Sequence, residues 1–151
     1  MTHKNILVTG GAGYVGSHVC VSLCDAGYTP IILDNFSNSS SRVIGCLEEI
    51  TEKKIDLIKG DVLEPALLHD LFRDNSIDGV LHLAGCKSVS ESVVDPLKYY
   101  HTNVNGSINI LEAMRRADVN VFVFSSSATV YGRPKTNPIT ESCPFSPENP
   151  Y

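Results

Sequence analysis

The chain has 151 residues, of which 12 are basic and 17 acidic, so its formal net charge is −5. The length suits a single domain, and the acidic balance argues against general nucleic-acid binding, which normally needs clustered Lys and Arg. Hydrophobic residues make up 42% and charged residues 19% of the chain, which excludes disordered and fibrous classes. No apolar run approaches the ~18 residues of a membrane span, so we expect a protein without membrane contact.

The first half of the chain alternates short apolar runs with segments of helical period. Asn5–Thr9 is predicted as a strand and Tyr14–Ala26 as a helix, because Val15, Val19 and Leu23 recur every four residues. The elements predicted next are a strand over Pro30–Asp34, a polar loop over Phe36–Arg42, a helix with Val43, Leu47 and Ile50 on one face, a strand over Ile55–Lys59 and a helix over about Glu64–Asp74.

The second half continues the alternation up to its last thirty or so residues. A strand is predicted over Asp78–Ala84, a long helix from about Asp95-Pro96, and a fifth strand over Val119–Ser125. Beyond Gly132 proline is frequent and the helical period is lost, which predicts loop. Strands that are apolar at consecutive positions and alternate with helices predict a parallel sheet covered on both faces. We therefore expect one α/β domain with the doubly wound parallel sheet of the Rossmann type.

The loop after the first strand carries a glycine pattern typical of dinucleotide binding. Gly11, Gly13 and Gly16 fit G-x-G-x-x-G, and Gly10, Gly13 and Gly16 fit G-x-x-G-x-x-G equally well. Glycines permit the tight turn and let backbone N–H groups approach a pyrophosphate at the positive end of the next helix. The pattern lies between a strand and a helix, as that mechanism requires, so it predicts a dinucleotide site; the alternative is a glycine-rich loop without a ligand.

Acidic residues close the second and third strands. Asp34 stands 21 residues after Gly13, where a carboxylate can accept both ribose hydroxyls of an adenosine and would repel a 2′-phosphate. No basic residue lies nearer than Arg42, so NAD is favoured over NADP. Asp61 could hydrogen-bond the adenine by the same logic. The alternatives are a cap or turn role for Asp34 and an Asp-initiated turn at Asp61.

Small and hydroxyl-bearing residues end the fourth and fifth strands. Leu83-Ala84-Gly85 would let a cofactor lie close to the backbone, and the serines of Ser125–Ser127 could donate to a substrate oxygen. The serines could instead form a polar loop that satisfies its own backbone. The odd count of five cysteines, without a C-x-x-C, predicts reduced thiols in the cytoplasm, with a reactive Cys86 as the alternative. The histidines show no metal-ligand spacing, so no metal site is expected.

Taken together, these motifs resemble the UDP-glucose 4-epimerase family, within the extended short-chain dehydrogenases/reductases. The segments TGGAGYVGSH, LDN, GDV, LAGCKSVSES, PLKYYHTNVNG and SSSATVYG stand in the family's order and spacing. The glycine motif and GDV occur throughout the extended branch, whereas the Lys87 segment paired with SSSATVYG is much more specific to 4-epimerases. A related sugar-nucleotide dehydratase, decarboxylase or epimerase is the alternative, although dehydratases usually place acidic residues where Ala128-Thr129 stands.

The resemblance implies NAD as the cofactor, a UDP-sugar as the substrate, and a set of residues that hold the cofactor. Those at the pyrophosphate would be Gly10, Gly11, Gly13, Tyr14, Val15 and Gly16. Those at the adenosine would be Asp34, Asn35, Asn38, Ser39, Asp61 and Val62. Those along the rest of the cofactor would be Leu83, Ala84, Gly85 and Lys87, with Lys87 near the nicotinamide ribose, and Asn103 matches a buried Asn of the family.

The resemblance also implies a catalytic pair and a reaction of galactose metabolism. Ser127 matches the family's catalytic serine, and Tyr151, preceded by Asn149-Pro150, matches the tyrosine that opens a Y-x-x-x-K motif. In the implied reaction, Tyr151 as phenolate takes the 4-hydroxyl proton of UDP-glucose or UDP-galactose while C4 passes hydride to NAD. Ser127 hydrogen-bonds the same oxygen, and hydride returns to the opposite face after the 4-keto sugar has turned over.

The sequence given stops at the first residue of that motif. The family's lysine would stand at position 155 and a sugar-nucleotide subdomain would follow, so we expect a truncated NAD-binding domain over residues 1–151 whose sheet is incomplete at its C-terminal edge. We expect negligible epimerase activity from this chain, exposed apolar side chains around Val121–Phe124 and a tendency to aggregate. The full-length enzyme is expected to be a homodimer. A non-catalytic nucleotide-binding module is the alternative function.

Overall fold

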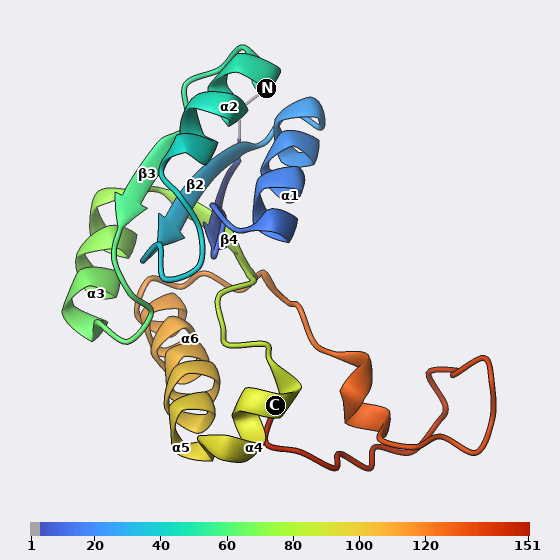
Figure 1. The fold of residues 1–151 in the computed structure, drawn as a ribbon. Helices are drawn as coiled ribbons and strands as arrows, with labels where there is room; N and C mark the ends of the chain where they lie inside the picture. The colour runs from blue at the N-terminus through green and yellow to red at the C-terminus, as the bar shows by residue number, and fades with distance from the viewer. Residues whose placement is uncertain (1–3) are drawn as a thin grey trace.

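The computed structural model describes residues 4–151, and within them one parallel sheet of five strands runs in the order β3-β2-β1-β4-β5 (Figure 1). The register is continuous across the centre, where Leu7 lies between Ile31 of β2 and Val80 of β4. The chain moves outward from β1 in one direction and then in the other, which confirms the doubly wound α/β fold. The strands are β1 (Asn5–Thr9), β2 (Thr29–Asp34), β3 (Asp56–Lys59), β4 (Ile77–His82) and β5 (Phe122–Phe124).

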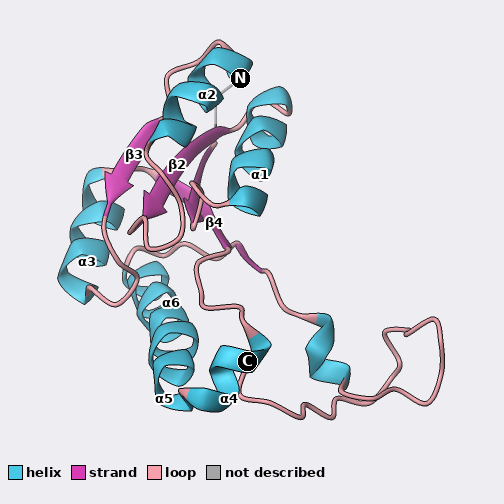
Figure 2. Ribbon diagram, viewed as in Figure 1, coloured by secondary structure: helices cyan, strands magenta, loops and turns pink. Residues whose placement is uncertain are grey.

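Helices cover both faces of this sheet (Figure 2). On one face, α1 (Tyr14–Asp25) and α2 (Arg42–Thr51) pack over a cluster of buried residues that consists of Val8, Cys20, Cys24, Ile32, Leu47 and Ile55. On the other, α3 (Pro65–Asp74) and α6 (Gly106–Arg116) pack over a larger cluster that includes Leu7, Leu33, Leu68, Phe72, Val80, Ile110 and Met114. Consecutive residues of β1 and β2 therefore belong to opposite cores, which explains why these strands are apolar throughout.

The long helix predicted from Pro96 is built from three parts, and a short helix precedes it. After α4 (Val89–Val94), the chain forms α5 (Pro96–Tyr99), a π-helical segment η1 (Tyr100–Asn105) and then α6. The sequence analysis missed α4, whose six residues are too few to show a period. Side chains define its start and that of α5: the Ser88 hydroxyl accepts from Glu91 N–H, and the Asp95 carboxylate accepts from Lys98 N–H.

The chain from β5 onward is less covered than the rest. The strand predicted over 119–125 is confined to three residues, and a 3₁₀ turn, η2 (Ala128–Tyr131), follows it. Val121, Val123 and Phe124 are 58%, 54% and 53% exposed, which confirms the expected exposed apolar surface. Residues 132–151 then run out as an extended arm, the orange-to-red segment of Figure 1, and return toward α4. Between residues 4 and 151, no helix is both long and apolar enough to cross a membrane.

Candidate functional site

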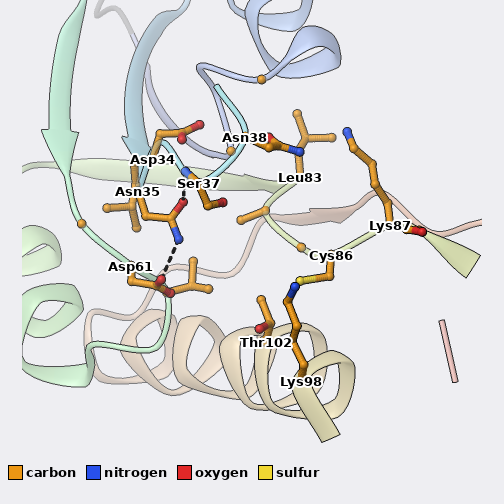
Figure 3. A pocket seen from close by; sticks show the side chains of 18 of the residues that line it. Asp34, Asn35, Ser37, Asn38, Asp61, Leu83, Cys86, Lys87, Lys98 and Thr102 are labelled. Atoms are coloured by element: carbon orange, nitrogen blue, oxygen red, sulfur yellow. Dashed lines mark hydrogen bonds between the residues drawn. The ribbon is translucent and has the colours of Figure 1, made fainter. Parts of the chain in front are cut away.

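A cavity of about 420 Å³ lies at the carboxyl ends of β1 to β4 (Figure 3). Its walls come from four strand ends and from the helices α4, α5 and η1. Loops at the carboxyl ends of adjacent parallel strands meet at one edge of the sheet, which is where doubly wound folds bind ligands. The lining residues are Gly10, Gly13, Leu33, Asp34, Asn35, Ser37, Asn38, Gly60, Asp61, Val62, Leu83, Ala84, Gly85, Cys86, Lys87, Ser88, Glu91, Lys98 and Thr102.

The glycine loop is packed too tightly to hold larger residues. Gly10 has a φ of +70°, and a Cβ there would lie 2.9 Å from the backbone nitrogen of Ala84. A Cβ on Gly16 would overlap the carbonyl oxygen of Gly10. The loop after β1 thus lies against the loop after β4, with the N-terminus of α1 directly behind it. Of the predicted pyrophosphate residues, Gly10 and Gly13 line the cavity, and Gly11, Tyr14, Val15 and Gly16 lie outside its lining.

The Asp34 carboxylate joins the glycine loop to the loop after β2. Its Oδ2 accepts from the backbone N–H of Ala12 at 3.0 Å. Its Oδ1 accepts from the backbone N–H of Phe36 at 2.8 Å and from the hydroxyl of Ser39 at 2.9 Å. Since a carboxylate offers about four acceptor positions, one position on Oδ2 is open to a further donor from the cavity. Ser39 does not line the cavity and acts here through Asp34.

The wall between β2 and β3 is made of polar side chains that hold each other. Asn35 donates from Nδ2 to Oδ2 of Asp61 at 2.6 Å, which Figure 3 marks with a dashed line between these two side chains. Oδ1 of Asp61 accepts from the backbone N–H of Leu63 at 2.9 Å, so Asp61 also forms the Asx-type turn considered from the sequence. Asn38 and Val62 complete this wall.

The loop after β4 is clamped from behind by Asn103. The side-chain oxygen of Asn103 accepts from the Cys86 N–H and its amide nitrogen donates to the Cys86 carbonyl, both at 2.8 Å. Gly85 makes room for this contact, since a Cβ there would lie 3.0 Å from Asn103 Oδ1. Asn103 therefore lies outside the cavity lining, with both of its amide groups engaged, whereas Lys87 lines the cavity.

Ser127 and Tyr151 lie apart from the cavity lining. Ser127 caps the start of η2: its Oγ accepts from the Thr129 N–H at 3.2 Å and lies 2.8 Å from the Thr129 hydroxyl. The Tyr151 ring packs edge-on against the buried ring of Tyr99, with centroids 6.3 Å apart. Within the described part of the chain, no hydrogen bond joins Ser127 to Tyr151 and neither side chain lines the cavity.

A family model described as GDP-mannose 4,6 dehydratase matches residues 7–151. The chain belongs to this family. It is 51% identical over 146 residues to the UDP-glucose 4-epimerase of Bacillus subtilis, an alignment that covers 97% of this chain and 43% of the relative. These matches confirm the resemblance to the UDP-glucose 4-epimerases of the extended short-chain dehydrogenases/reductases.

Solved structures of UDP-glucose 4-epimerases are similar to this chain in both fold and sequence. The UDP-glucose 4-epimerase of Bifidobacterium longum, in complex with NAD+ and UDP, matches with a TM-score of 0.96 at 44% identity, over 98% of this chain and 44% of that one. The enzyme of Stenotrophomonas maltophila, with bound NAD and formylated UDP-arabinopyranose, matches with a TM-score of 0.95 at 42% identity, over 99% of this chain and 44% of that one. The chain thus spans less than half the length of these relatives.

The sequence analysis did not predict one charged cluster in the cavity wall, which Glu91, Lys98 and Tyr99 form. Lys98 Nζ lies 2.5 Å from Glu91 Oε1, and the Tyr99 hydroxyl donates to Glu91 Oε2 at 2.7 Å while accepting from the Ser88 N–H at 2.9 Å. The hydrogen bond to Glu91 raises the pKa of Lys98, and the bonds from Lys98 and Tyr99 lower the pKa of Glu91. Both groups stay charged near neutral pH. Figure 3 shows Lys98 rising from α5 toward Cys86.

The cysteine thiols differ in acidity: hydrogen bonds from Thr136 and Thr140 lower the pKa of Cys143. Burial raises the pKa of the Cys20 thiol to about 12, so it is inert near neutral pH. All five cysteines lie within the described residues and none forms a disulfide. Over residues 4–151, no group of three or more His, Cys, Asp or Glu side chains could hold a metal ion.

Proposed function

We propose that residues 1–151 bind NAD and form the cofactor-binding half of a UDP-glucose 4-epimerase. The observation that carries the proposal is the cavity that joins the glycine loop, the Asp34 carboxylate and Lys87 at one edge of the sheet. The similarity to epimerases that were crystallised with NAD supports it independently.

The residues present fit a dinucleotide without a 2′-phosphate. Gly10 and Gly13 bring the glycine loop to the cavity wall beside the N-terminus of α1, where a pyrophosphate would be stabilised. The open acceptor position on Asp34 suits a ribose hydroxyl and opposes a phosphate. Lys87 brings a positive charge to the same cavity, which suits the negative charge of a dinucleotide, whereas Lys98 is paired there with Glu91.

Bound NAD would supply a hydride acceptor for C4 of the hexose and return the hydride, with no net redox change. In the proposed reaction, Tyr151 takes the proton of the 4-hydroxyl group and Ser127 hydrogen-bonds the same oxygen. Both side chains would have to move closer to the cavity, because Ser127 is engaged with Thr129 and Tyr151 packs on Tyr99. We therefore expect a polypeptide of residues 1–151 to bind NAD without epimerising a UDP-sugar.

A homodimer is proposed for the full-length enzyme. Leu97 on α5 is 78% exposed, and Ile108 and Leu111 on α6 are 47% and 45% exposed, so one helical surface carries a row of apolar side chains. Such a surface suits burial against a second copy. Sedimentation of the full-length enzyme as a dimer, lost in Leu97→Glu, is the expected result; a wild-type monomer at micromolar concentration would contradict it.

A second candidate function is a non-catalytic NAD-binding module. The separation of Ser127 and Tyr151 from the cavity lining favours it, because the cavity needs neither residue to be complete. Both candidates predict NAD binding, and they differ in whether any form of the protein turns over a UDP-sugar.

Calorimetric titration of the chain with NAD+ and with NADP+ tests the proposal. Saturable one-to-one binding of NAD+, weaker binding of NADP+, and loss of binding in Asp34→Ala are expected. Asp56→Ala, at an exposed carboxylate at the start of β3, is the matched control and should leave the affinity unchanged. Absence of NAD+ binding would overturn the proposal. Conversion of UDP-galactose to UDP-glucose by residues 1–151 alone would overturn only the expectation of inactivity.

A further inference from the structure

Behind the cavity, a chain of hydrogen bonds crosses from β1 to the π-helical segment. Thr9 Oγ1, at the end of β1, lies 2.6 Å from Nδ1 of His82 at the end of β4. His82 Nε2 lies 3.0 Å from Ser107 Oγ, and the Ser107 hydroxyl donates to the Asn103 carbonyl at 2.6 Å. Thr9 is fully buried and His82 is 1% exposed, so no water competes for the imidazole.

The partners fix which ring nitrogen of His82 carries the proton. The Ser107 hydroxyl gives its hydrogen to the Asn103 carbonyl, so Ser107 Oγ must accept from His82 Nε2–H. His82 Nδ1 then accepts the hydrogen of the Thr9 hydroxyl. The opposite tautomer would place two oxygens of Ser107 and Asn103 at 2.6 Å with no hydrogen between them, or leave Nε2 without a donor.

The environment of the ring keeps it neutral. Burial lowers the pKa of His82 to about 4. The imidazole packs beside the rings of Phe122 and Phe124 of β5, at centroid distances of 6.0 Å and 5.9 Å. At neutral pH His82 therefore has one donor and one acceptor, and each faces its matching partner.

Both ends of this series of hydrogen bonds contact the same loop of the cavity, the loop that follows β4. At one end, Thr9 Oγ1 accepts from the backbone N–H groups of Leu83 and Ala84, each at 3.2 Å. At the other end, the side chain of Asn103 clamps both polar backbone groups of Cys86. The imidazole is the member that joins these two clamps, one based on β1 and the other on η1. π-Helical segments are rare and often occur at functional sites.

We infer that His82 is a positioning residue of the cofactor cavity, whose Nε2–H imidazole couples Thr9 to the Ser107–Asn103 pair and so fixes the loop from Leu83 to Lys87. His82 does not line the cavity, so it acts through the loop and touches no ligand. Its effect on NAD affinity rests on the function proposed above, whereas its effect on the loop does not.

Two substitutions separate hydrogen bonding from packing. His82→Phe keeps an aromatic ring against Phe122 and Phe124 but removes both hydrogen bonds. Ser107→Ala leaves the His82 ring in place and removes the hydrogen bonds that Ser107 makes to His82 and to Asn103. It keeps the test open if His82→Phe fails to fold. His69→Phe is the matched control, since His69 on α3 has a side chain that is 54% exposed.

Amide hydrogen exchange of the chain without any ligand is the direct measurement. His82→Phe and Ser107→Ala should each speed exchange at the Ala84 and Cys86 amides by about tenfold or more, and leave α3 amides unchanged. NAD+ affinity should fall by about tenfold in each variant. The double variant should bind NAD+ as tightly as His82→Phe does, because both substitutions interrupt the same series of hydrogen bonds. His69→Phe should change neither quantity.

The outcomes distinguish the two proposals. Imidazole ¹⁵N NMR should show a protonated Nε2 and an unprotonated Nδ1 at pH 7, and Ser107→Ala should move the Nε2 signal. An Nδ1–H tautomer, or unchanged exchange at Ala84 and Cys86 in both variants, would overturn the positioning role. If the wild type shows the expected tautomer and the two variants show the expected faster exchange, but the wild type does not bind NAD+, only the proposed function is overturned.

Discussion

The covered part of the sheet and the segment from β5 onward differ in how they are stabilised. Leu7 and Val8 of β1 are fully buried because helices lie over both faces of the central strands. Val123 and Phe124 of β5 are more than half exposed, and among residues 4–151 β5 pairs only with β4. The cavity belongs to the covered part, whereas Ser127 and Tyr151 belong to the exposed part. The cavity and the proposed catalytic pair therefore lie in regions that differ in how far their apolar side chains are buried.

The largest expected effect tests the difference in burial. Leu7→Ala should lower the free energy of unfolding by about 3 kcal/mol, because it leaves a cavity between the sheet and the helices α3 and α6. Val123→Ala, the matched change in β5, should cost less than about 1 kcal/mol because its side chain is 54% exposed. Urea unfolding followed by circular dichroism measures both. Equal losses at the two positions would break the comparison.

A second prediction concerns two glycines. Gly10→Ala should destabilise the chain by about 1–3 kcal/mol, because an alanine would have to adopt a positive φ and press on the Ala84 backbone. Gly45→Ala, in α2 with open space around it, should stabilise by about 0.5–1 kcal/mol. Thermal unfolding should therefore move in opposite directions, and a neutral Gly10→Ala would show that the loops after β1 and β4 are not tightly packed.

The pH dependence of the free energy of unfolding tests whether the buried imidazole of His82 is neutral. His82 has its pKa lowered from 6.5 to about 4 by burial, so the unfolded chain binds a proton first as pH falls. Stability is then lost between pH 6.5 and 4, and the loss from pH 7 to pH 5 should be about 2 kcal/mol. His82→Phe should remove this part of the slope. A wild-type free energy of unfolding that is flat between pH 7 and pH 5 would contradict a buried neutral imidazole.

The smallest stability change is expected at the exposed strand. Val123→Lys should alter the free energy of unfolding by less than about 1 kcal/mol, because the side chain already faces outward. It should reduce aggregation, since a charge on an edge strand opposes pairing with another chain. Size-exclusion chromatography with light scattering compares the variant with the wild type. Equal amounts of aggregate in the variant and the wild type would show that the chain does not aggregate through β5.

Local patterns were enough to predict the elements around the first three strands. The bounds of β1 agree because its apolar run is closed by the glycine loop, and Pro65 begins α3 as expected of a first-turn proline. α4 was missed because six polar and β-branched residues show no period. β5 is shorter than its apolar run, since its register with β4 spans Phe122 to Phe124, and Val121 and Ser125 each add one backbone hydrogen bond to β4.

The site could be predicted where residues stand at strand ends. Asp34, Asp61 and Lys87 come together because parallel strands end at one edge, so position along the chain fixes position in space. Glu91 and Lys98 pair across two helices, and His82 meets Ser107 across 25 positions, so neither contact leaves a periodic signal. Tertiary packing alone decides such pairs.

The most direct test of the central claim is to locate the NAD+ site by NMR. Backbone amide shifts of the chain are followed as NAD+ is added. Binding in the cavity predicts saturable shifts concentrated at Gly10 to Gly13 and at Gly85 to Lys87, with residues 140–148 of the extended arm unaffected. No saturable shifts, or shifts confined to the exposed segment after β5, would contradict it.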